Sequence, residues 1–178
     1  EGVERLMVVA EAIAFFRHAL DEAEEAVGKI ARSWIEELVE GCAWLQQSAP
    51  KGLVRKLKLL QSYEGSLWEG CLREIGDVPP RRIVALAPFY DGNSELVKRI
   101  AKTWPRAKIE LVVQQNTTNL NVESLRRVKD RVALSELGDK TRRLHAKMLA
   151  WEGKAGAGCL MGSANLTCAA FDGANVEA

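Results

Sequence analysis

Apolar residues recur at three- and four-residue steps through the first part of the chain, a spacing typical of amphipathic helices. The pattern predicts one helix over residues 3–26 and a second over residues 29–47, with Gly28 as the break between them. An apolar stripe that includes Trp34 runs along the second helix and predicts a packing surface. We therefore expect an amphipathic helical segment over residues 1–50.

The pattern changes in the rest of the chain, where short apolar runs alternate with amphipathic stretches. Runs of this length fit buried strands, and strands that alternate with helices favour an α/β sheet with right-handed crossovers. The strands are predicted at residues 82–88, 108–113 and 131–134, and the helices at 66–75, 94–104 and 122–128. Ser94 is expected to cap the second of these helices. Residues 51–178 are therefore predicted to form an α/β domain with a mixed sheet flanked by helices.

Two more strands are predicted near the C-terminus, over residues 144–151 and 158–162. The segment between them is rich in glycine, which is typical of a hairpin loop. With the loop centred between residues 154 and 155, paired positions sum to 309 and Lys147 lies opposite Gly162.

This predicted hairpin gathers side chains that suit a phosphate group. Successive side chains of a strand point to opposite faces, so His145 and Lys147 share one face, and the register brings Ser163 and Asn165 beside them. Lys147 offers a positive charge with three donors, and Ser163 and Asn165 offer neutral donors for phosphate oxygens. Since a histidine can attack phosphorus or transfer protons near neutral pH, we expect catalysis or phosphate binding here.

The charge of the chain is balanced in total but unevenly distributed. The sequence has 25 Lys and Arg against 24 Asp and Glu, a net charge of +1. Residues 1–50 hold 4 basic and 10 acidic residues and sum to −6, whereas residues 96–147 hold 13 basic and 5 acidic residues and sum to +8. Such runs are usually solvated surface, but beside a predicted phosphate site they favour an anionic substrate. The candidates for steering a polyanion are Arg126, Arg127, Arg142 and Arg143. The polar loop 114–121 is a candidate edge of the substrate site.

Several classes of protein and site do not fit the composition. The four cysteines lack the spacing of a zinc site or a disulfide framework, so we expect buried free thiols, no metal and no cofactor. Free thiols favour a reducing compartment, and the cytoplasm is the expected location. No apolar run approaches the roughly 18 residues that cross a bilayer, so no membrane insertion is expected. The chain does not begin with methionine, which suggests a fragment of a longer protein.

The order of these residues resembles the signature of the phospholipase D superfamily, which is His-x-Lys, four residues, Asp, and then Gly-Ser-x-Asn. The sequence reads His145-Ala-Lys147, four residues, Glu152, then Gly162-Ser-Ala-Asn165, and Asn175-Val-Glu177 is similar to the family's downstream Asn-x-Glu element. The resemblance covers roughly residues 66–178 and implies the fold of a phospholipase D-like half-domain.

The resemblance implies a role for each matching residue. His145 would be the nucleophile that forms a phosphohistidine intermediate, or the general acid. Lys147 and Asn165 would hold non-bridging phosphate oxygens, and Ser163 would support the phosphate or the histidine. Glu177 would accept a hydrogen bond from the imidazole.

The match is incomplete in two respects. Glu152 stands where the family has Asp, and its longer side chain leaves its supporting role behind the site open. Family members also place two such motifs face to face, and this chain has only one other histidine, His18, without a lysine two residues later. The resemblance therefore implies a second half from a homodimer mate or from another part of the parent protein.

Three functions are compatible with the sequence. The first is a metal-independent phosphodiesterase that acts on DNA or RNA, which the basic segment favours. The second is a phospholipid hydrolase or phosphatidyltransferase, for which no basic apolar helix provides support. The third is a non-catalytic half-domain that binds DNA or mediates assembly within a larger protein.

Overall fold

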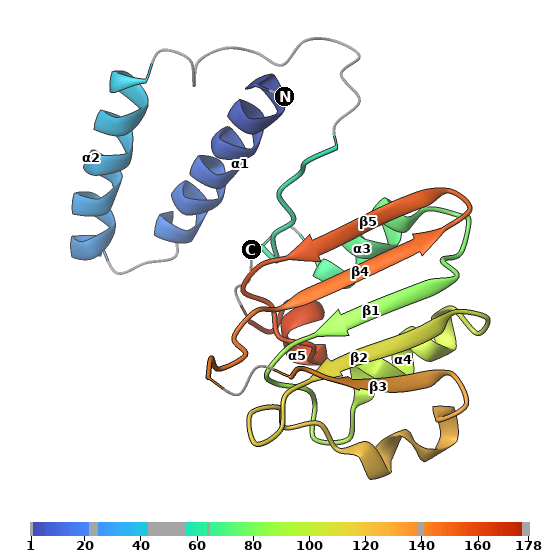
Figure 1. Cartoon of the computed structure of the whole chain (residues 1–178). Helices are drawn as coiled ribbons and strands as arrows, with labels where there is room; N and C mark the ends of the chain where they lie inside the picture. The colour runs from blue at the N-terminus through green and yellow to red at the C-terminus, as the bar shows by residue number, and fades with distance from the viewer. Residues whose placement is uncertain (1, 22–24, 43–55, 64, 139–140, 176–178) are drawn as a thin grey trace. The chain divides into compact units, whose positions relative to one another are not determined.

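The computed structural model describes residues 2–21, 25–42, 56–63, 65–138 and 141–175, and it divides into two compact units (Figure 1). The first unit comprises Glu1–Tyr63 and the second comprises Glu64–Ala178. The boundary predicted between residues 50 and 51 lies outside the described residues. The second unit contains the sheet and the residues of the candidate site.

The first unit contains two helices, α1 (Gly2–Asp21) and α2 (Glu25–Gly41), which pack against each other. The guanidinium of Arg17 on α1 contacts the carboxylate of Glu36 on α2 at 2.6 Å. None of the helices within the described ranges combines the length and the apolar character that crossing a membrane demands.

The helix α2 differs from its prediction in two respects. The predicted break at Gly28 is wrong, because Gly28 is buried inside α2 and the chain leaves α1 at Asp21 instead. A glycine costs a helix only about 1 kcal/mol relative to alanine, a cost that packing can offset. The apolar stripe is not part of a core within the described residues: Ile30, Trp34 and Leu38 are exposed, Trp34 to 67%.

The second unit is built on a mixed five-stranded sheet with the order β3-β2-β1-β4-β5 (Figure 1). β1, β2 and β3 run parallel, whereas β4 is antiparallel to β1 and β5 is antiparallel to β4. The strands are β1 (Arg82–Leu86), β2 (Lys108–Val113), β3 (Val132–Glu136), β4 (Met148–Gly153) and β5 (Gly156–Met161). The α/β class and the mixed sheet are therefore confirmed.

The β4–β5 hairpin has the predicted register. Met148 pairs with Met161 and Trp151 pairs with Gly158, so paired positions sum to 309 and the turn is Lys154-Ala155. Gly158 lies against the ring of Trp151, and a Cβ there would stand 2.3 Å from the ring atom Cζ2. Glycine is therefore required for the indole to lie across its neighbour.

Helices cover one face of the sheet (Figure 1). They are α3 (Leu67–Ile75), α4 (Glu95–Thr103) and α5 (Cys168–Phe171). A 3-10 helix, η2 (Val122–Val128), packs against α4. The apolar sides of α3 and α4 meet the inner strand residues in one core, in which Ile83, Leu96, Ile100, Ile109 and Leu111 are at most 1% exposed. Burial of aliphatic side chains contributes about 1.5–3 kcal/mol each, so this core holds the sheet that carries the site.

The opposite face of the sheet has no helix over it in the part of this unit that the structure describes (Figure 1). Met161 on this face is 68% exposed. Elsewhere on this face, the guanidinium of Arg82 contacts Glu110 at 2.6 Å, and the hydroxyl of Ser135 donates to the same carboxylate at 2.7 Å. These two hydrogen bonds, the one from Arg82 first, hold the pKa of Glu110 below its ordinary value. This face therefore combines apolar positions with a hydrogen-bonded charged cluster.

The prediction that the cysteines are buried free thiols holds fully only for Cys71 in α3. Its side chain is fully buried, and this burial, with a smaller contribution from Glu74, raises the pKa of its thiol to about 12. Cys159 is exposed on β5, and Cys168 is half-buried. All four cysteines are unpaired.

Candidate active site

His145 and Lys147 lie in an irregular segment, residues 141–147, that leads into β4. The prediction that both belong to the strand is wrong, because the ladder with β5 begins only at Met148. The side chains nevertheless meet: Nζ of Lys147 lies 3.3 Å from Nε2 of His145 and 3.0 Å from its carbonyl oxygen. An ammonium group only donates, so a hydrogen bond from Lys147 across this contact would use Nε2 as its acceptor. An unprotonated ring nitrogen is the form that a nucleophile needs.

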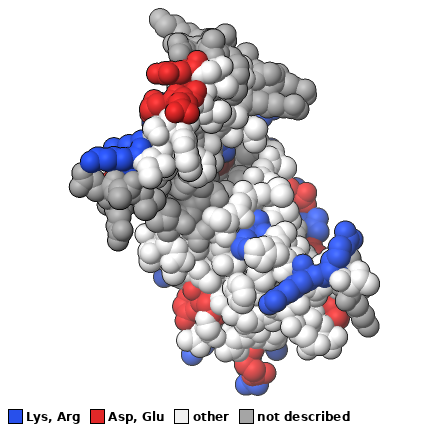
Figure 2. Space-filling model, turned by 90° about the vertical axis from the view of Figure 1, so that its left-hand side faces the viewer, with Lys and Arg blue, Asp and Glu red and all other residues white. Residues whose placement is uncertain are grey.

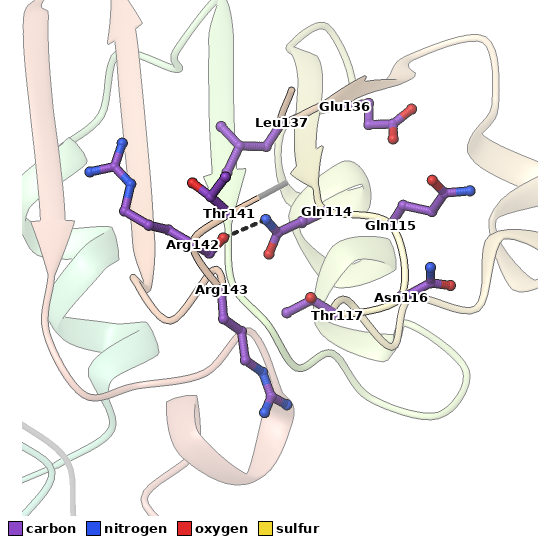
Figure 3. Close-up of a pocket in the computed structure, with 9 residues that line it drawn as sticks. All are labelled: Gln114, Gln115, Asn116, Thr117, Glu136, Leu137, Thr141, Arg142 and Arg143. Atoms are coloured by element: carbon purple, nitrogen blue, oxygen red, sulfur yellow. Dashed lines mark hydrogen bonds between the residues drawn. The ribbon is translucent and has the colours of Figure 1, made fainter. Parts of the chain in front are cut away.

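A buried glutamine at the end of β2 holds this segment in place (Figure 3). Nε2 of Gln114 donates to the carbonyl oxygen of Arg142 at 2.7 Å, and Oε1 accepts from the N–H of Leu144 at 2.6 Å. The side-chain amide of Gln114 thus donates one hydrogen bond to this segment and accepts one from it, as the backbone of a neighbouring strand would do. Gln114 is 7% exposed and Leu144 is 6% exposed, so water competes little for these bonds. This glutamine clamp fixes the backbone directly before His145.

The turn that carries Ser163 and Asn165 follows β5 and lies beside the backbone of Lys147. The N–H of Gly162 donates to the carbonyl oxygen of Lys147 at 3.4 Å, so the predicted register extends one pair beyond the strands. At the other end of this turn, the N–H of Leu166 donates to a backbone carbonyl oxygen of the loop after β1 at 3.2 Å. Ser163 is exposed and Asn165 is half-buried. The structure therefore brings this turn to Lys147.

Asn165 has a buried polar atom without a partner. Its Oδ1 is buried and makes no hydrogen bond within the described ranges. Buried polar atoms are almost always paired in folded proteins, and an unpaired one costs about 1–3 kcal/mol. The described part of the chain therefore supplies no donor for this oxygen.

Asp91 ties the loop after β1 to two helices. One carboxylate oxygen accepts from the N–H of Leu96 at 2.9 Å, at the start of α4, and the other accepts from the N–H of Cys168 at 2.8 Å, at the start of α5. The prediction that Ser94 caps α4 is wrong, because Ser94 has a φ of 56° and makes no side-chain bond to the helix. Its hydroxyl is buried and lies 2.9 Å from that of Ser124. Asp91 takes the capping role and also anchors the segment after Asn165.

We expect Asp91→Ala to lower the free energy of unfolding by about 2 kcal/mol, because two backbone N–H groups lose their acceptor. Urea unfolding followed by circular dichroism measures this change. Asp77→Ala is the matched control, since Asp77 is an exposed carboxylate on the connection before β1. A loss in Asp91→Ala no larger than that in the control would contradict the role of this carboxylate.

Of the two acidic residues predicted to support the site, one lies elsewhere and the other is outside the described residues. Glu152 lies near the far end of β4, and its carboxylate is 3.5 Å from the guanidinium of Arg82. Strands rise about 3.3 Å per residue, so Glu152 is roughly 17 Å along the chain from Lys147. The structure therefore does not put Glu152 behind His145, because β4 carries it to the opposite end of the sheet. Glu177 lies outside the described residues.

The four arginines predicted to steer a polyanion separate into two pairs. Arg126 and Arg127 are exposed on η2, where Arg126 contacts Glu123 at 2.5 Å. Arg142 and Arg143 are exposed directly before Leu144. The second pair alone therefore adjoins His145 in the chain.

An open pocket of about 600 Å³ lies beside the glutamine clamp, between the loop after β2, the end of β3 and the segment before His145 (Figure 3). Most of its lining side chains are polar, and they include Gln114, Gln115, Asn116, Glu136, Arg142 and Arg143. The side on which β1 and β2 end faces the viewer in Figure 2, where Lys and Arg form an elongated group and Asp and Glu stand in separate patches. The pocket lining itself carries two positive charges, Arg142 and Arg143, against one negative charge, Glu136.

The pattern of apolar residues does not single out Gln114 or Asp91 as functional. Gln114 falls within the polar loop 114–121, predicted only as an edge of the substrate site, and Asp91 follows the first apolar run. A polar residue after the end of a buried strand is the signal that could have found both.

The described residues contain no group of three or more His, Cys, Asp or Glu side chains that could hold a metal ion. No protein-family model matches the chain, and no curated protein matches its sequence. Function is therefore argued from the geometry of the site.

Proposed function

We propose that this chain is a phosphodiesterase half-domain of the phospholipase D type that cleaves nucleic acid, with His145 as its nucleophile. The observation that carries the proposal is the 3.3 Å contact between Nζ of Lys147 and Nε2 of His145. At this distance a single phosphate group can contact the positive charge of Lys147 and the unprotonated Nε2 of His145 at the same time.

The proposed reaction has two displacements at phosphorus. Nε2 of His145 attacks, a P–N bond forms, and the bond from phosphorus to the leaving oxygen breaks as that oxygen takes a proton from a general acid. Water then attacks phosphorus and gives a proton to the group that acted as general acid, and the P–N bond breaks, which restores the imidazole and releases the phosphate product. Lys147 and Asn165 stabilise the charge on the non-bridging oxygens, and Ser163 supports the phosphate.

The general acid is proposed to be a second histidine, supplied by a homodimer mate or by another part of the parent protein. His18 does not suit this role, because it lies in α1, where its ring contacts Tyr63 at 4.6 Å between centroids. The unpaired Oδ1 of Asn165 also supports a missing neighbour, since a buried acceptor needs a donor.

Nucleic acid is favoured over phospholipid as the substrate. Residues 96–147 carry a net charge of +8, from 13 basic and 5 acidic residues, and the exposed Arg142 and Arg143 lie just before His145. A chain of phosphates gains from several such charges at once, whereas a single headgroup does not.

Trapping of the covalent intermediate tests the proposal. The protein is mixed with bis(p-nitrophenyl) phosphate in the presence of EDTA and quenched in alkali, in which phosphohistidine survives. We expect a burst of nitrophenol and a nitrophenyl phosphate adduct on the tryptic peptide Leu144–Lys147. Lys147→Ala should reduce the burst rate, and Lys154→Ala, at the turn on the other end of β4, is the matched control.

Two results would contradict the proposal. One is turnover that disappears with EDTA, which would indicate a metal-dependent reaction. The other is tight nucleic-acid binding without any adduct in the assembled protein, which would support the non-catalytic half-domain instead.

A further inference from the structure

The pocket beside the glutamine clamp and the candidate active site share one segment of the chain, residues 141–147. Its wall contains Arg142 and Arg143, and only the buried Leu144 separates Arg143 from His145. Gln114 lines the pocket and also bonds the backbone of Arg142 and Leu144. The segment that Gln114 holds therefore contributes Arg142 and Arg143 to the pocket and carries His145 two residues further on.

The side chains around the pocket offer both donors and acceptors. The amides of Gln115 and Asn116 offer both, Glu136 only accepts, and Arg143 only donates (Figure 3). A nucleobase presents donors and acceptors along its edges, and its phosphate suits an arginine. An acyl chain, in contrast, requires an apolar lining, which these residues do not provide.

The size of the pocket also fits a single nucleotide. Its volume of about 600 Å³ lies within the range of roughly 300–1,000 Å³ that small-molecule sites occupy. A base can enter such a pocket only when it is unstacked from its neighbours, and extracting it from a duplex costs a few kcal/mol. In a single strand the base is already unpaired, so its entry into the pocket costs less free energy than extraction from a duplex.

We infer that this pocket binds the nucleotide next to the scissile phosphodiester and thereby selects single-stranded nucleic acid. This inference rests on the proposed function and names the form of its substrate. Gln115 and Glu136 contact the base, and Arg143 holds the phosphate that joins this nucleotide to the one at His145.

Binding measurements that need no turnover test the inference. The cleavage-blocked His145→Ala protein is titrated with a short fluorescein-labelled DNA single strand of mixed sequence, with its duplex, and with phosphatidylglycerol vesicles. We expect the single strand to bind at least about 10-fold more tightly than the duplex. Adding Arg143→Ala or Gln115→Ala should raise the Kd for the single strand about 5- to 10-fold. Arg143→Ala should also reduce the slope of log Kd against log salt by about 1.

Arg106→Ala is the matched control, because Arg106 is an exposed arginine before β2, at the other end of that strand from Gln114. Equal effects of Arg106→Ala and Arg143→Ala, equal binding of duplex and single strand, or preferential binding of vesicles would each overturn the inference. These outcomes are independent of the trapping experiment. An adduct on His145 without the binding pattern would leave the proposed reaction standing, and the binding pattern without an adduct would leave the nucleotide site standing.

Discussion

Replacement of His145 by alanine is expected to reduce phosphodiester cleavage by more than about 10³-fold, because the reaction loses its nucleophile. Nε2 of this ring lies 3.3 Å from Nζ of Lys147, the charge proposed to hold the phosphate. The side chain is exposed, and its removal should change the free energy of unfolding by less than about 0.5 kcal/mol. Steady-state hydrolysis of bis(p-nitrophenyl) phosphate in EDTA, with urea unfolding alongside, measures both quantities.

The sequence supplies its own control for this prediction. His18 is the only other histidine, and it lies exposed on α1, where it contacts Tyr63. His18→Ala should leave the rate of hydrolysis within about twofold, because it removes a surface ring contact only. Comparable losses in the two variants would exclude His145 as the nucleophile.

Gln114→Leu is expected to have the second-largest effect, on both stability and turnover. The substitution removes the donor to the carbonyl oxygen of Arg142 and the acceptor for the buried N–H of Leu144, which should cost about 2–4 kcal/mol of unfolding free energy. It also releases the backbone next to His145, and a displacement of about 1 Å can lower kcat roughly 10²-fold. KM for a small diester should change far less than kcat, because Gln114 positions the nucleophile and does not contact that substrate.

A conservative variant separates positioning from general destabilisation. Gln114→Glu keeps the shape and the acceptor for Leu144, but an ionised carboxylate cannot donate to the carbonyl oxygen of Arg142. Burial and this carbonyl should raise the pKa of the introduced carboxyl above its value in the unfolded chain. The bond to Arg142 should therefore be present below the unfolded pKa and be lost as pH rises through the folded pKa.

Stability and kcat of Gln114→Glu should both recover toward acidic pH relative to Gln115→Glu, whose side chain is exposed on the next residue. Unfolding and single-turnover rates across pH measure this recovery. A deficit that does not vary with pH would argue against a hydrogen-bonded clamp.

Much of the sheet could be predicted because its strands are set by local patterns. The apolar run at 108–113 is the strand β2, residue for residue, and the glycine-rich segment around Lys154-Ala155 fixed the hairpin register. The break between the two N-terminal helices was misplaced at Gly28, since a glycine weakens a helix but does not end it when tertiary packing holds it. Local pattern thus predicts elements better than it predicts their ends.

The candidate site could be predicted in part for a different physical reason. Alternation along a strand placed His145 and Lys147 on one side, and the side chains do meet, although the segment is not a strand. What holds that segment is the side chain of Gln114, which is 28 and 30 residues away from its two partners. A bond between a side chain and a distant backbone follows no hydrophobic period, so the apolar pattern does not reveal its partners, and only the place of Gln114 after a buried strand marks the residue.

The shortness of the Lys154-Ala155 turn has a consequence for how this site could change. The turn lies at the opposite end of the hairpin from Lys147, yet its length decides that Gly162 is the residue that meets Lys147. One inserted residue would slip the returning strand by a single step and exchange its inward and outward side chains. Substitutions in the turn are therefore tolerable, whereas a change in its length would separate the residues of the proposed catalytic centre, which lies at the other end of the hairpin.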